Sequence, residues 1–123
     1  LKNKGIKTNL KYGFRENHIE KVRSKSRIFL FGSRLECSPL VLYESASSGL
    51  PFISFNAGNS QEIAKKTGAG IIVNTIGEMA KVINELFFNK KLNMKLSKNG
   101  IKNSSKFSWK TIAMSYLKVF KSI

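Results

Sequence analysis

The stretch Glu36-Cys-Ser-Pro-Leu-Val-Leu-Tyr-Glu44 decides the fold that we expect for this chain. It follows a continuous apolar run at 28–31, which is typical of a strand buried on both faces. Ser38 is a favourable N-cap, and Pro39 suits the first position of a helix. The sequence therefore predicts a strand, then a turn, and then a helix over residues 39–48.

The start of that helix is expected to bind phosphate. A helix that begins just past the carboxyl end of a strand presents free backbone N–H groups to a cleft, and these groups favour an anion. The residues whose N–H groups would lie there are Ser38, Leu40 and Val41. Glu44 lies one helical turn after Leu40 on the same face, so it would point toward the same ligand. Arg34, in the turn, could pair with a phosphate, pair with Glu36 or lie in solvent.

Apolar runs alternate with amphipathic stretches along the rest of the chain. We expect further strands at 6–12, 51–55 and 71–73. Further helices are expected at 15–23, 60–66, 76–88, 91–103 and from residue 109 onward. The expected caps are Ser60, Thr75 and Ser108 at helix starts and Gly49 after residue 48. Strands that alternate with helices predict an α/β domain with a parallel sheet, whose ligands bind at the carboxyl ends of its strands.

The composition is strongly basic, with 22 Lys and Arg against 7 acidic residues and a formal net charge of +15. Such a charge attracts nucleic acid, anionic lipid or nucleotide diphosphates, but dispersed Lys is more typical of a solvated surface. We therefore attribute the charge mainly to a solvated surface. A membrane surface is a secondary candidate for a partner, and nucleic acid is not expected to be one. One cysteine and no apolar run of membrane-spanning length indicate a cytoplasmic protein, with the inner face of the membrane as a secondary location.

The sequence offers acids for chemistry but no metal site. His18 is the only histidine and Cys37 the only cysteine, so no Cys/His cluster with metal-ligand spacing exists, and we expect neither a metal nor another cofactor. Glu36 and Glu44 could form an acid and base pair of the kind that hydrolyses glycosides. Their separation in space does not follow from the sequence, because Glu36 precedes the helix.

Several segments, in order, resemble one known family. Glu36 and Glu44 match the E-x7-E motif of retaining glycosyltransferases of the GT-B fold, most closely glycosyltransferase family 4, also called glycosyl transferases group 1. The flanking segments that also resemble this family are 29–33, 44–53, 56–63 and 107–109. A lone E-x7-E motif is weak, whereas the ordered set of segments is specific.

The resemblance implies a fold, an activity and residue roles. The fold would be the C-terminal, nucleotide-sugar-binding, Rossmann-like half of a GT-B enzyme. Residues 1–123 would form a truncated part of it, with the N-terminal acceptor domain absent and the fragment alone inactive. The activity would be transfer of a sugar, with retained configuration, from a nucleotide-sugar to a hydroxyl acceptor in glycan or glycolipid synthesis. Glu36 would be the catalytic residue beside the donor sugar, and Glu44 would accept hydrogen bonds from the ribose. The further donor-binding residues implied are Gly58, Asn59 and Glu62.

One segment departs from the family pattern. Cys37-Ser-Pro39 stands where many members carry Gly-Phe-Gly, and Pro39 has no N–H to offer the donor sugar. Two other classes of function stay open on the sequence. One is a noncatalytic remnant that binds a nucleotide or a protein, and the other is a basic module that binds nucleic acid with steep salt dependence.

Overall fold

Three short strands form one parallel sheet at the centre of the structure. The computed structural model describes residues 5, 7–10, 12–13 and 15–123. The strands are β1 (Phe29–Phe31), β2 (Phe52–Phe55) and β3 (Gly70–Val73), hydrogen-bonded in that order. The helices are α1 (Glu16–Lys25), α2 (Leu40–Ser47), α3 (Ser60–Thr67), α4 (Ile76–Phe88), α5 (Lys90–Ser104), the short 3-10 helix η2 (Ser105–Phe107) and α6 (Trp109–Phe120). This arrangement confirms the expected α/β fold with a Rossmann-like parallel sheet flanked by helices.

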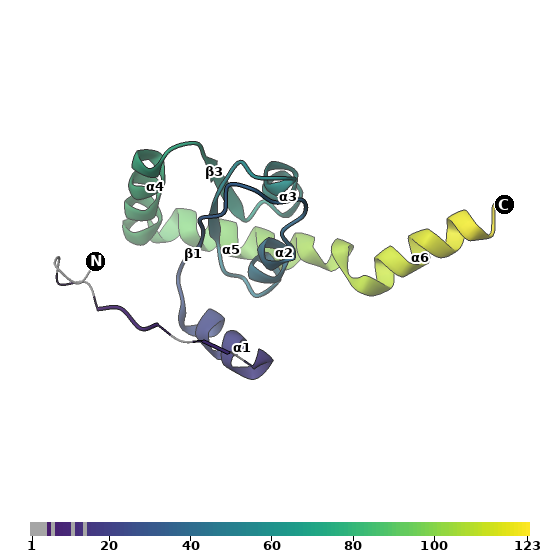
Figure 1. Cartoon of the computed structure of the whole chain (residues 1–123), viewed down its shortest axis with the longest axis horizontal. Coiled ribbons are helices and arrows are strands. Elements are labelled where there is room, and N and C mark those ends of the chain that lie inside the picture. The colour runs from purple at the N-terminus through teal and green to yellow at the C-terminus, as the bar shows by residue number, and fades with distance from the viewer. Residues whose placement is uncertain (1–4, 6, 11, 14) are drawn as a thin grey trace.

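Helices cover both faces of the sheet (Figure 1). Side chains alternate along β2, so Phe52 faces α2 and α3, whereas Ile53 faces α4 and α5. Phe52 packs in one core cluster with Leu42 and Ile63, and Ile53 packs in the other with Leu86. All five side chains are fully buried. Burial on both faces explains why β2 carries large apolar side chains at two successive positions, Phe52 and Ile53, rather than at alternate ones.

The end of α2 is closed as the sequence predicts. Gly49 adopts a φ of 70°, and its N–H donates to the carbonyl of Ala46 at 3.0 Å. The N–H of Leu50 donates to the carbonyl of Ser45 at 3.0 Å, which completes a Schellman motif. The Ser45 hydroxyl also donates to the carbonyl of Leu50 at 2.8 Å. These bonds turn the chain sharply from α2 into β2.

Two helix starts also follow the expected capping pattern. Thr75 Oγ1 accepts from the N–H of Glu78 at 3.1 Å, and the Glu78 carboxylate accepts from the N–H of Asn74 at 2.7 Å. Ser108 Oγ accepts from the N–H of Thr111 at 3.2 Å at the start of α6. Both hydroxyls satisfy N–H groups that lack a partner within their helix.

Helix α6 extends away from the body that the other helices form around the sheet (Figure 1). Its large apolar side chains are exposed, including Trp109 at 75% and Phe120 at 69%. Throughout the described residues, no helix is both long enough and apolar enough to cross a membrane.

Two expectations about secondary structure are wrong. The strand expected at 6–12 does not form in its described residues, 7–10 and 12, where Leu10 and Tyr12 are 81% and 92% exposed. These side chains have no apolar surface to pack against, and residues 6 and 11 lie outside the described part. Ser60 does not cap α3 but is its first helical residue, because its hydroxyl donates to the carbonyl of Phe55 instead.

Candidate functional site

Two loops meet at the carboxyl ends of β1 and β2. One loop, 32–39, leads from β1 into α2, and the other, 56–59, leads from β2 into α3. The N–H of Asn59 donates to the carbonyl of Cys37 at 3.1 Å, and its side-chain Nδ2 donates to Ser38 Oγ at 3.1 Å. Oδ1 of Asn59 is buried, and within the described residues it accepts no hydrogen bond. The junction of these loops therefore contains a buried acceptor whose hydrogen-bonding capacity is unused among the described residues.

Gly58 allows the two loops to approach so closely. A Cβ atom on this residue would lie 2.3 Å from the carbonyl oxygen of Cys37 and 2.5 Å from that of Glu36. The φ of Gly58 is +54°, which side chains other than glycine's rarely adopt. The sequence placed Gly58 at the site, and the structure shows a tight contact between its backbone and that of Glu36.

Glu36 lies at this junction with a half-buried side chain. None of the described residues forms an ion pair or a hydrogen bond with its carboxylate. Gly58 lies directly against its backbone, and the next residue, Cys37, accepts the hydrogen bond from the N–H of Asn59. The carboxylate is thus attached to a fixed backbone and remains available to a ligand.

The first turn of α2 differs from the expectation in one respect. Pro39, not Ser38, is the N-cap, and α2 begins at Leu40. Ser38 does not cap because its hydroxyl is engaged by Asn59 across the loop junction. Leu40 and Val41 are the first two residues of the helix, so their N–H groups have no partner within it. These two donors remain the candidates for an anion.

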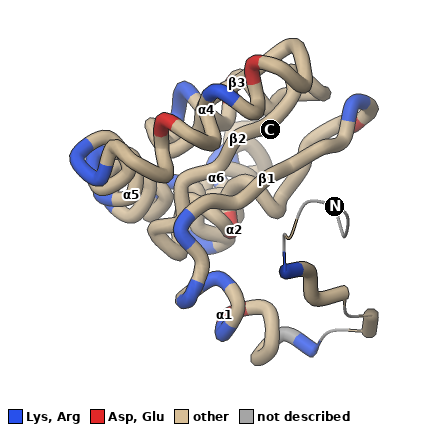
Figure 2. Tube along the Cα trace, turned by 90° about the vertical axis from the view of Figure 1, so that its left-hand side faces the viewer, with Lys and Arg blue, Asp and Glu red and all other residues tan. Residues whose placement is uncertain are grey.

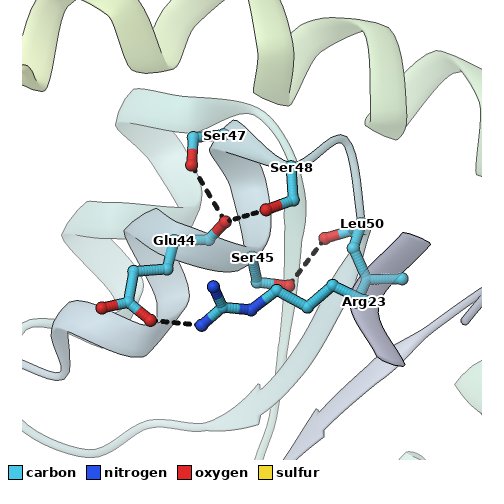
Figure 3. Close-up of polar contacts among 6 residues, drawn as sticks. All are labelled: Arg23, Glu44, Ser45, Ser47, Ser48 and Leu50. Carbon is cyan, nitrogen blue, oxygen red and sulfur yellow. Dashed lines mark hydrogen bonds and ion pairs between the residues drawn. The ribbon is translucent and has the colours of Figure 1, made fainter. Parts of the chain in front are cut away.

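Glu44 lies one turn further along α2 and contacts α1. Its Oε2 accepts a hydrogen bond from Nη2 of Arg23 within an ion pair (Figure 3). The side chain of Arg23 is 17% exposed and that of Glu44 is 53% exposed. Both residues line a pocket of about 330 Å³ between α1, the start of β1 and α2, whose other lining residues include Ile19, Val22, Val41 and Leu50.

The backbone of Glu44 is also held firmly. Its carbonyl accepts from the hydroxyls of Ser47 at 2.9 Å and Ser48 at 2.8 Å, and from the N–H of Ser48 at 3.1 Å (Figure 3). Neither serine was expected at the site. The sequence carried only a general signal for them, since Ser and Thr hydroxyls commonly bond the carbonyl three or four residues earlier.

Two of the expected residues have other partners. The guanidinium of Arg34 lies 4.1 Å from the centre of the Phe55 ring, in a cation–π contact. The carboxylate of Glu62 forms an ion pair with Lys66, one turn later on α3. The hydrogen bond and the attraction from Glu62 raise the pKa of Lys66 above its ordinary value. The structure thus brings Glu36, Ser38, Gly58 and Asn59 together, whereas Glu62 is paired along its own helix.

Basic residues are spread over the molecule. Figure 2 shows Lys and Arg segments around α1, α4 and α5. This distribution agrees with a solvated basic surface. In the part of the chain that the structure describes, no group of three His, Cys, Asp or Glu side chains could hold a metal ion.

Comparisons with known proteins agree with the family resemblance of the sequence. The model of a family described as glycosyl transferases group 1 matches residues 1–103. Sucrose-phosphate synthase 4 of Arabidopsis thaliana is 30% identical over 102 residues, which cover 80% of this chain and 10% of that protein. Sucrose-phosphate synthase 1 of the same plant is 28% identical over 102 residues, with the same coverage. The chain therefore spans about a tenth of the length of these relatives.

Proposed function

Because this chain belongs to the family of glycosyl transferases group 1, we propose that it forms the donor-binding part of a retaining glycosyltransferase. The whole protein would transfer a sugar from a nucleotide-sugar to a hydroxyl acceptor in glycan or glycolipid synthesis. One observation carries the proposal. A single strand–turn–helix unit presents Glu36 and the free N–H groups of Leu40 and Val41 after the carboxyl end of β1, with Glu44 one turn further along α2, where it contacts α1.

This order matches the parts of a nucleotide-sugar. The N–H groups of Leu40 and Val41 would bind the diphosphate and stabilise the negative charge that it gains as the leaving group. Glu44 would accept hydrogen bonds from the two ribose hydroxyls, since a carboxylate has acceptor sites for both. Glu36 would lie beside the sugar and stabilise the positive charge that develops on its ring in the transition state.

The loop after β2 would complete the donor site. Gly58 lies directly against the backbone of Glu36, and Oδ1 of Asn59 is a buried acceptor without a partner among the described residues, which a sugar hydroxyl could satisfy if the Asn59 side chain turned toward it. Ser38 supports this arrangement through its hydrogen bond with Asn59. Arg34, which lies over the Phe55 ring, would add a positive charge near the diphosphate. Glu62 would lie at the edge of the donor site.

The position of the diphosphate gives the most direct test. In a structure of the full chain with UDP, ADP or GDP, we expect a diphosphate oxygen within hydrogen-bonding distance of the N–H of Leu40 or Val41. That N–H group has no partner within α2, so an anion there replaces only water. A diphosphate bound away from the start of α2 would contradict the proposed site.

The contact with ribose can be tested in solution. Glu44→Ala should weaken the binding of nucleoside diphosphates by about tenfold to a hundredfold, because a hydrogen bond to a charged group contributes roughly 1.5–3 kcal/mol. For nucleotide-sugars, the loss of affinity should be the same whichever hexose they carry, since the hexose takes no part in this contact.

A double-mutant cycle provides the control. Calorimetry on the full chain would pair Glu44→Ala with 2′,3′-dideoxy nucleotides, which lack both ribose hydroxyls. We expect Glu44→Ala to have little effect on the dideoxy ligands. Additive losses would mean that Glu44 and the ribose do not meet, and Glu44 would then be a structural acid on α2.

A further inference from the structure

The ion pair between Arg23 and Glu44 joins two helices that are far apart in the sequence. Arg23 lies in the last turn of α1, and Glu44 lies in the middle of α2. The two residues are 21 positions apart, with β1 and the loop that follows it between them. Arg23 is largely buried, so most of its water shell has been replaced by protein. A buried guanidinium needs a partner of opposite charge, and Glu44 supplies it.

We propose that Arg23 is a positioning residue of the donor site, which holds the Glu44 carboxylate by one oxygen so that the other can accept from ribose hydroxyls. This inference rests on the proposed function. The arrangement of atoms supports it directly. Arg23 engages Oε2 of Glu44, and within the described chain no residue donates to Oε1. Figure 3 shows the guanidinium of Arg23 in contact with the carboxylate of Glu44, and the Ser47 and Ser48 hydroxyls bonded to the Glu44 carbonyl.

The benefit of this arrangement is preorganisation. A glutamate at a helix surface samples several rotamers, and a ligand that needs one of them must immobilise the side chain on binding. Three hydrogen bonds already fix the Glu44 carbonyl, and Arg23 fixes the far end of the side chain. The ribose would therefore meet a carboxylate that has already lost most of its freedom.

Arg23 also suits this role better than lysine would. Its planar guanidinium can hold a carboxylate in one orientation, whereas an ammonium group is a point charge on a flexible chain. Arg23→Lys keeps the charge and can restore one hydrogen bond to Oε2. We therefore expect Arg23→Lys to be intermediate between the native protein and Arg23→Ala.

The experiment measures the affinity of the full chain for UDP, ADP and GDP and for their 2′,3′-dideoxy counterparts by calorimetry. Immobilising one flexible side chain costs about 0.5–1.5 kcal/mol, so Arg23→Ala should weaken the ribonucleotides by roughly twofold to tenfold. The dideoxy nucleotides should bind Arg23→Ala and the native protein equally. In Glu44→Ala, the further change Arg23→Ala should have no additional effect on the ribonucleotides.

Lys25→Ala is the matched control. Lys25 is an exposed basic residue on the same helix, so its loss removes one positive charge from α1 while leaving the ion pair intact. We expect its nucleotide affinities to equal those of the native protein. If Lys25→Ala and Arg23→Ala weaken binding equally, the effect is one of general charge and the inference is wrong.

The outcomes separate this inference from the proposed function. If Glu44→Ala leaves ribonucleotide binding unchanged, the ribose assignment of the proposed function is wrong. If Glu44→Ala weakens binding but Arg23→Ala does not, the donor site stands and the role of Arg23 is refuted. If Arg23→Ala weakens the binding of ribonucleotides and of dideoxy nucleotides equally, Arg23 has only a structural role and the inference is wrong. Should Arg23→Ala fail to fold, the same comparison on Arg23→Lys decides the question.

Discussion

If Glu36 is the catalytic residue that we propose, Gly58→Ala should lower the turnover of sugar transfer by about a hundredfold, because displacing a catalytic group by about 1 Å can cost that much. The new Cβ would lie 2.3 Å from the Cys37 carbonyl oxygen and 2.5 Å from the Glu36 carbonyl oxygen. Real Cβ atoms essentially never approach other atoms within 3.0 Å, so something must move. Both atoms belong to the backbone rather than to a flexible side chain. The loop that carries the Glu36 carboxylate must therefore shift.

The measurement is turnover at saturating donor, together with thermal unfolding to show that the variant is folded. Gly77→Ala is the control, since Gly77 is exposed on α4 and a Cβ there would approach only Thr75 Oγ1, at 3.9 Å. This control should keep full turnover and gain about 0.5–1 kcal/mol of stability, because alanine favours a helix over glycine. Full turnover in a folded Gly58→Ala would show that the position of the 36–37 backbone does not matter for transfer.

Much of the fold could be predicted because it depends on local patterns. The runs that form β1, β2 and β3 are mostly apolar, and each is followed by a stretch with helical spacing. Thr75 and Ser108 lie directly before helices and cap them as expected. In both cases the donor and the acceptor lie within four residues of each other, so a short stretch of sequence includes both partners.

The remaining features depend on residues that meet only in the folded chain. Ser38 has the sequence context of an N-cap, but its hydroxyl is held by Asn59, 21 residues later. The partner of Glu44 is Arg23, 21 residues earlier, and no periodicity links the two. A spacing motif predicts Glu36 and Glu44 as site residues, but it does not indicate which other residues contact them in the folded chain.

Glu36→Gln tests the chemistry itself, because it keeps the size of the side chain and removes its charge. If the carboxylate stabilises positive charge on the sugar ring, the charge matters most in the transition state. Removing one such electrostatic group lowers turnover by about 10²–10³-fold in comparable sites, and we expect a loss of that order here. The affinity for UDP, ADP or GDP should change little, since those ligands lack the transferred sugar that Glu36 would contact.

The distinction between turnover and binding decides the role of Glu36. Steady-state kinetics of sugar transfer would give kcat and KM for the donor, and calorimetry would give the affinity for the nucleoside diphosphate. Glu85→Gln, an exposed acid on α4, controls for the loss of one negative charge and should leave both unchanged. A fall in kcat with unchanged nucleotide binding places the Glu36 carboxylate at the reacting sugar. A rise in KM with unchanged kcat would instead mean that Glu36 binds the donor equally in the ground state and the transition state, and it would not be the catalytic residue.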